Sequence, residues 1–154
     1  MYYARAVDST MLVALSALAS EQASPTNNTM KKLFLFLDYA ASKEETVVTY
    51  HASDMVLACY RDALYLSEPG ARRRAGGNFF LSNDATMPAN NGAVLNIVQT
   101  IKSVMTSAAE AEIGAMFIND REAVPQRMKM VEMGHLQPKN IHADGQFRCA
   151  CYCH

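Results

Sequence analysis

The spacing of apolar residues changes near residue 46, and this change limits the possible folds more than any other feature of the sequence. Residues 8–23 and 29–42 repeat apolar side chains every three or four positions, as amphipathic helices do, and the loop 24–28 between them predicts a helical hairpin. Beyond residue 46 the sequence turns to β-forming residues, first at 46–51 and then in three candidate strands at 54–66, 78–82 and 93–100. The two patterns together predict a mixed α/β fold.

The candidate strands are joined by short connections, which favours an antiparallel meander. Residues 55–60 are apolar without alternation, the pattern of a central strand that is covered on both faces. The connection 68–77 is typical of a turn and carries a basic cluster, Arg72, Arg73 and Arg74.

Residues 103–133 predict a long helix with clear end signals. Gly134 is typical of the position just after a helix end, and Pro138 prevents the helix from continuing. Pro125 lies inside the helix and predicts a bend or a break. A short strand that ends near Asp144 should follow, so the expected order is three strands, a helix and another strand.

Composition narrows the class of protein. The chain has 154 residues, of which 50% are apolar and 19% charged, enough for one packed domain with an extra segment. The net charge of −1 argues against a surface devoted to nucleic acid but allows a local basic patch. The apolar run 11–19 is too short to span a membrane, and the first residues lack the layout of a signal peptide. We therefore expect a soluble, intracellular protein.

Three of the four cysteines lie in the last six residues, at Cys149, Cys151 and Cys153. With His154 they allow a zinc-binding interpretation, although zinc sites usually space paired cysteines two to four residues apart. The alternative is an incidental tail at a chain end.

Two glutamates near the start of the long helix cannot share a face, because Glu110 and Glu112 lie about 200° apart around the helix axis. The stripe that begins at Glu110 is apolar, so we expect it to be the core face; it continues through Ile113, Phe117, Val124, Met128 and Val131. The stripe of Glu112 is more polar and should be solvated. Glu110 is then the carboxylate at the sheet-facing edge, where it needs a cation or a hydrogen-bond network.

Two further acidic residues lie where predicted apolar strand segments end. Asp62 ends the apolar run of the first long strand, and Asp144 ends the strand after the helix. If these strands are neighbours, both acids emerge where the helix that carries Glu110 begins. Three such carboxylates predict a site for hard cations, and a pair of these ions can activate water for phosphodiester hydrolysis. The alternative is structural: Glu110 forms a salt bridge with one of the three arginines at 72–74, or it is exposed in the first helical turn.

The sequence contains three motifs in a fixed order: "SDMVLACYRDALYLSEPGARRRAGGNFFLS", "NNGAVLNIVQTIKSVMTSAAEAEIGAMFINDREAV" and "EMGHLQPKNIHADGQ". As an ordered set, over roughly residues 50 to 147, they resemble the ribonuclease H domain of copia-type retrotransposon polyproteins. That family has Asp-Ala-Ser-Tyr-Leu-Ser-Glu, then Ala-Arg-Ser-Arg-x-Gly-Gly, then Ser-Ser-x-Glu-Ala-Glu, then Thr-Asp-Asn.

The resemblance implies an RNase H-like mixed sheet with flanking helices and hydrolysis of the RNA strand of RNA–DNA hybrids by two metal ions, Mg²⁺ or Mn²⁺. Carried over by position, the family's catalytic and metal-binding acids fall on Asp62, Glu110 and Asp144, with Asp62 bridging both ions. Arg72 to Arg74 match the basic hairpin of the family and are expected to contact phosphates.

The resemblance also implies a domain organisation. Residues 1–45 look like the helical connection that follows the reverse transcriptase in the same polyproteins, 46–148 match part of the RNase H-like domain, and 149–154 form a Cys-rich tail. The family continues after the third acid with a helix, a strand and a fourth acid, so we expect a domain truncated at its C-terminus. Gly145 stands where the family has Asn, and Leu64 where it has Ser.

The partners implied are an RNA–DNA hybrid and the reverse transcriptase portion of the polyprotein, without a membrane. The implied location is the cytoplasm, the nucleus or a virus-like particle. The alternative function is that of a non-catalytic remnant, which binds nucleic acid weakly or has no activity.

Overall fold

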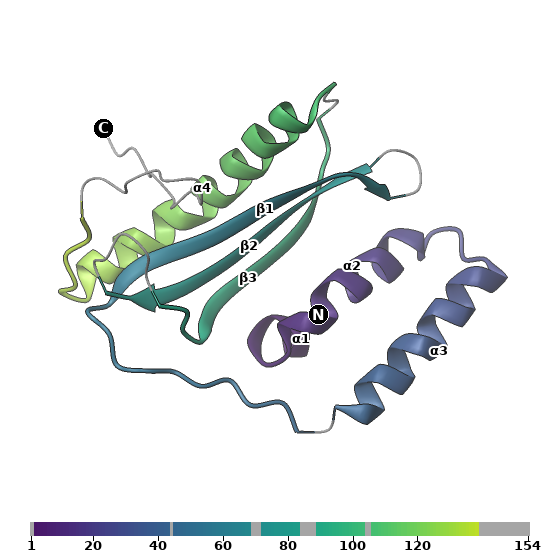
Figure 1. Cartoon of the computed structure of the whole chain (residues 1–154), viewed down its shortest axis with the longest axis horizontal. Coiled ribbons are helices and arrows are strands. Elements are labelled where there is room, and N and C mark those ends of the chain that lie inside the picture. Colours follow the sequence, from purple (N-terminus) through teal and green to yellow (C-terminus); the bar gives the residue numbers. More distant parts are fainter. Residues whose placement is uncertain (1, 44, 69–71, 84–88, 104–105, 139–154) are drawn as a thin grey trace. The chain divides into compact units, whose positions relative to one another are not determined.

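The computed structural model describes residues 2–43, 45–68, 72–83, 89–103 and 106–138. The chain combines helices with an antiparallel sheet, which confirms the expected mixed α/β fold class (Figure 1). It divides into two compact units, Met1–Val48 and Thr49–His154, and each is described by itself. No helix of the described residues is long and apolar enough to cross a lipid bilayer.

The first unit is helical, and side chains cap the starts of its two longer helical segments. Asp8 caps the first long helical segment by accepting a hydrogen bond from the Thr10 amide at 3.0 Å, and Thr26 caps the second through a reciprocal pair with Thr29. The elements are α1 (Tyr2–Ala6), η1 (Ser9–Met11), α2 (Leu12–Glu21) and α3 (Asn27–Ser42). The expected hairpin of two helices is confirmed, with α2 and α3 in contact.

Polar contacts join the helices of this unit. The Glu21 carboxylate accepts hydrogen bonds from the Thr29 hydroxyl at 2.7 Å and from the Lys32 ammonium. These two donors, Lys32 first, hold the pKa of Glu21 below its ordinary value. The hydroxyl groups of Thr10 and Tyr39 lie 2.7 Å apart.

The second unit contains a three-stranded antiparallel meander, as expected, in the order β1-β2-β3. Its strands are β1 (Val56–Glu68), β2 (Arg72–Ser82) and β3 (Ala93–Ile101). The register places Tyr60, Asn78 and Asn96 in one row across the sheet. Among the described residues β1 lies at one end of the strand order. The strand expected to end near Asp144 lies outside the described residues, so the interpretation of β1 as a central strand stays a prediction.

Two segments differ from what their sequence suggests. Residues 46–51 are rich in β-forming residues but form no strand; instead the Tyr50 ring packs on Gly92 and its hydroxyl donates to the Ala93 carbonyl at 3.0 Å. β-forming residues make a strand only where a partner strand is available. The segment 68–77 was expected to be a turn, but β2 already begins at Arg72 and pairs with both neighbours.

The long helix α4 (Ala108–Glu132) begins at Ser107, whose hydroxyl accepts a hydrogen bond from the Glu110 amide at 3.2 Å. Its end matches the sequence signal, because Gly134 has a left-handed backbone with φ +91° and closes the last turn. The helix runs through Pro125 without a break in its helical residues.

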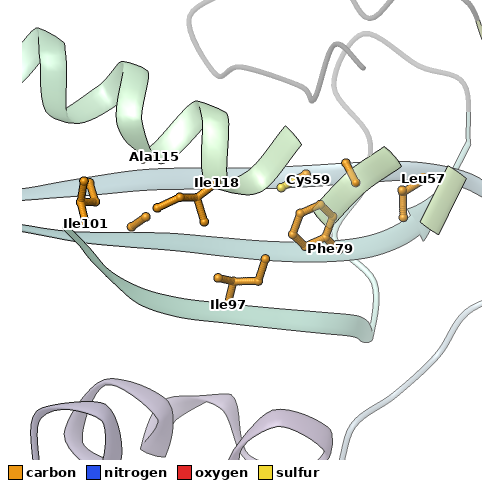
Figure 2. Packing of buried hydrophobic residues seen from close by; sticks show 9 residues of the cluster. Leu57, Cys59, Phe79, Ile97, Ile101, Ala115 and Ile118 are labelled. Carbon is orange, nitrogen blue, oxygen red and sulfur yellow. The ribbon is translucent and has the colours of Figure 1, made fainter. Parts of the chain in front are cut away.

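The core lies between α4 and one face of the sheet (Figure 2). The helix packs mainly on β1 and β2 and contributes two alanines and Ile118 to the buried cluster. The buried cluster consists of Leu57, Cys59, Ala75, Phe79, Ile97, Ile101, Ala115, Ile118 and Ala123.

Most of the apolar stripe that was expected to be the core face of the helix lies on its outer side; of its members, Val124 packs against the buried cluster. Ile113 and Phe117 are 61% and 67% exposed, and Met128 and Val131 are also exposed. The buried face instead carries Ala111, Ala115, Ile118, Asn119 and Ala123. On this face the fully buried Asn119 side chain donates to the Gly76 carbonyl at 3.1 Å, and three of the five buried helix residues are alanines.

Candidate functional site

Asp62 lies in β1 opposite Gly76, and its side chain is exposed. Its carboxylate accepts a hydrogen bond from the Ala63 amide at 2.8 Å. The neighbours Cys59 and Ala63 pack in the core beneath α4. Because successive side chains of a strand point to opposite faces, Asp62 points to the face of the sheet away from α4.

Arg61 points to the helix side of the sheet and fixes the position of α4 on β1. Its side chain is 7% exposed, and its Nη1 lies 3.3 Å from Oδ1 of Asp120, which is 29% exposed. Towards the start of the strand, the Leu57 amide donates to the side chain of Gln137 at 2.9 Å. Helix α4 therefore runs antiparallel to β1.

Glu110 lies in the first turn of α4 and its side chain is exposed. The carboxylate accepts hydrogen bonds from the amide and the hydroxyl of Thr106, the latter at 3.1 Å from each oxygen. A carboxylate at this position also interacts favourably with the positive end of the helix dipole. The expectation that Glu110 faces the sheet is therefore wrong; like Glu112, it is exposed.

The structure does not bring Asp62 and Glu110 together. Asp120 is level with Arg61, and Glu110 precedes Asp120 by ten residues, or about 15 Å along the helix axis. Asp62 also lies on the opposite face of the sheet. In this arrangement the two acids do not fit one shared metal ion, and the described residues contain no group of three His, Cys, Asp or Glu that suits a metal.

Several predicted site residues lie outside the described residues. Asp144, the third acid, is one of them, and so are Cys149, Cys151, Cys153 and His154 of the proposed zinc module. The three-acid site and the zinc site stay predictions.

The structure describes the side chain of only one of the three arginines at 72–74. Arg74 is only 2% exposed, so its guanidinium is not available to a phosphate at the surface. Arg72 and Arg73 belong to β2, and their side chains lie outside the part of the chain that the structure describes.

Sequence reasoning missed two polar groupings. The Asn78 amide donates to Asn96 at 2.8 Å on the face away from α4, beside the ring of Tyr60. The Gln137 side chain bonds to the start of β1. The Asn78–Asn96 pair can be found only once the pairing of β2 with β3 is known. No sequence signal indicates the contact of Gln137 with β1.

Comparison with known proteins adds no neighbour to this description. No family model, no curated protein and no solved structure matches the chain.

Proposed function

We propose that this chain is the ribonuclease H region of a copia-type retrotransposon polyprotein and that its ligand is an RNA–DNA hybrid. The order of elements carries the proposal. An antiparallel meander is followed by a helix that packs on β1 and β2, with the first acid of the resemblance, Asp62, in β1 and the second, Glu110, in the first turn of α4.

The resemblance implies hydrolysis with Mg²⁺ or Mn²⁺ held by Asp62, Glu110 and Asp144. The two described acids do not fit a shared ion, since they differ in sheet face and in position along the helix. We derive no reaction step through a metal and propose that the chain in this conformation binds hybrid without cleaving it.

Arg72 and Arg73 are the proposed phosphate contacts. Both belong to the strand that the resemblance aligns with the basic hairpin, while the buried Arg74 is excluded. Binding through phosphates releases counterions, so the affinity should fall steeply as salt is added.

The binding test measures fluorescence anisotropy of a labelled RNA–DNA hybrid across a salt series. Replacing Arg72 and Arg73 with alanine should lower the salt slope by about two, one for each lost phosphate contact. The matched control removes the same charge from the exposed face of α4, through Arg121→Ala with Lys129→Ala, and should leave the slope unchanged. Hybrid binding that is absent, or equally weakened by both pairs, contradicts the proposal.

Cleavage is measured in parallel, with Mg²⁺ or Mn²⁺ and the same hybrid. We expect intact RNA with the parent chain. Cleavage by the parent that Asp62→Asn abolishes would replace the binding proposal with the hydrolytic one and would show that the acids come together in solution. Cleavage that persists in Asp62→Asn would place the activity elsewhere and contradict both.

A further inference from the structure

The chain between α3 and β1 is fastened to the second unit before β1 begins. Helix α3 ends at Ser42, and β1 begins at Val56. In the described residues 45–48 the structure records no hydrogen bond. Residues 50, 51 and 54, by contrast, are bonded to residues 93, 91 and 83 at the connection between β2 and β3. Both sets of partners belong to the second unit.

Asn91 makes the central contact of this segment. Its Oδ1 accepts from the amides of His51 and Gly92, both at 2.8 Å. Its Nδ2 donates to the carbonyl groups of His51 at 3.0 Å and Leu81 at 2.7 Å. An asparagine side chain offers two donors and two accepting positions, so all of them are used here. His51 is therefore bonded through both of its backbone groups to one side chain, where a strand residue would be bonded to a neighbouring strand.

Gly92 leaves the space in which Tyr50 lies. A Cβ added to residue 92 would be 2.7 Å from two carbons of the Tyr50 ring and 2.8 Å from the Thr49 carbonyl oxygen. The Tyr50 hydroxyl donates to the Ala93 carbonyl at 3.0 Å. The segment thus depends on the absence of a side chain at residue 92 as well as on the Asn91 amide.

Asn83 holds the other end of the segment, because its Oδ1 accepts from the Asp54 amide at 2.9 Å. Residues 49–54, called the strap below, are thereby attached at both ends. Tyr50, His51 and Asp54 are all exposed. A segment that is held by a few exposed hydrogen bonds and buries little apolar surface opens locally at a low free-energy cost.

We propose that the strap is a releasable attachment, held by Asn91 and Asn83, that sets the length of free chain between the two units. Residues 43–48 alone span roughly 20 Å when fully extended, and release of the strap adds six residues and roughly doubles this reach. The inference concerns the connection between the units and does not depend on hybrid binding.

The first test is amide hydrogen exchange in the full-length parent chain at low urea concentrations. Exchange of the His51 amide should depend only weakly on urea, because the opening is local, whereas the amide of the buried Phe79 should depend on it strongly. An equal urea dependence at both residues would show that the strap opens only when the whole unit unfolds, and would overturn the proposal.

The second test removes the Asn91 contact. Asn91→Ala should speed exchange of the His51 amide by about tenfold or more, since two hydrogen bonds to His51 are lost. Asn90→Ala makes the same change at the exposed neighbouring residue and should leave the rate unchanged. An unchanged rate in Asn91→Ala, or an equal increase in both variants, contradicts the role of Asn91.

Gly92→Ala releases the strap in a different way, by steric displacement of Tyr50 with Asn91 kept in place. It should also speed exchange at His51, whereas Gly76→Ala, whose Cβ would meet its nearest atom at 3.8 Å, should not. This variant keeps the proposal testable if Asn91→Ala does not fold, and an unchanged His51 rate in Gly92→Ala counts against the strap.

Small-angle X-ray scattering measures the reach. The double variant Asn83→Ala with Asn91→Ala should show a larger maximum dimension than the parent and Asn90→Ala. A maximum dimension equal to that of the parent, together with faster exchange at His51, would overturn the claim that the strap sets the length of free chain between the units.

Discussion

Oδ1 of Asn119 lies directly against Gly77: a Cβ added to residue 77 would be 1.8 Å from this oxygen and 2.9 Å from the carbon that bears it. Asn119 is fully buried, and its Nδ2 donates to the carbonyl groups of Gly76 and Ala115 at 3.1 and 2.8 Å. The side chain is held from two sides and cannot move aside cheaply. The glycine at 77 therefore sets how closely α4 approaches the sheet.

Gly77→Ala should lower the free energy of unfolding by about 1–3 kcal/mol, as overpacking does in a tight core. Gly76→Ala is the matched control, because the nearest atom to its Cβ is 3.8 Å away, an ordinary contact. Urea unfolding followed by circular dichroism gives both values. In an Asn119→Ala background the cost of Gly77→Ala should shrink; an equal cost in both backgrounds would show that this contact is not the cause.

Asp120→Ala should destabilise the second unit, because it removes the carboxylate that faces the nearly buried guanidinium of Arg61. We expect a loss of about 1–3 kcal/mol, the range for removing a charged hydrogen-bond partner from a nearly buried group. Glu122→Ala removes the same charge from an exposed pair with Arg121 and should change stability by less than about 1 kcal/mol. Chemical denaturation compares the two, and equal losses would argue against the burial explanation.

The stability of the helical unit should depend on pH through Glu21, whose pKa is lowered by the Lys32 ammonium and the Thr29 hydroxyl. A folded pKa below the unfolded value of about 4.3 gives a stabilisation that is fully present above this value. It is lost as the pH falls through the lowered folded pKa. The parent should therefore lose its advantage over Glu21→Gln on acidification, measured by helical circular dichroism during thermal unfolding. A constant difference from neutral to acidic pH would contradict the assignment.

Met55 has a left-handed backbone with φ +60°, just before β1 begins, and its carbonyl accepts from Gln137. L-residues in this conformation are strained by about 1–2 kcal/mol, and β-branched residues more. Met55→Gly should therefore unfold at a higher urea concentration than Met55→Val. The reverse order would show that backbone strain at residue 55 does not decide the relative stability of the two variants.

Sequence patterns predicted the helices and strands better than they predicted which face of the long helix is buried. The glycine after a helix end acts locally, so the end of α4 at Gly134 followed from a short pattern. Residues 46–51 could not be judged in this way, because a strand depends on a partner that local pattern does not reveal.

The face of α4 was predicted wrongly for a related reason. The count of apolar residues favoured Ile113 and Phe117, but the contact between Asn119 and Gly77 selects the alanine face, and these residues are distant in sequence. The predicted acids illustrate the same limit. Asp62 and Glu110 lie in the expected elements, yet the direction of each side chain follows from strand register and helix rotation.

The face of α4 that contacts the sheet is rich in alanine, whereas larger apolar side chains lie on its exposed face. The helix residues that stabilise the fold therefore differ from those that contact solvent. Polar replacements at Ile113 or Phe117 should be tolerated, since both side chains are largely exposed and neither belongs to the buried cluster. Ala115, at 1% exposure, has no such latitude. Over generations the inner face of this helix should change slowly while its outer face diversifies.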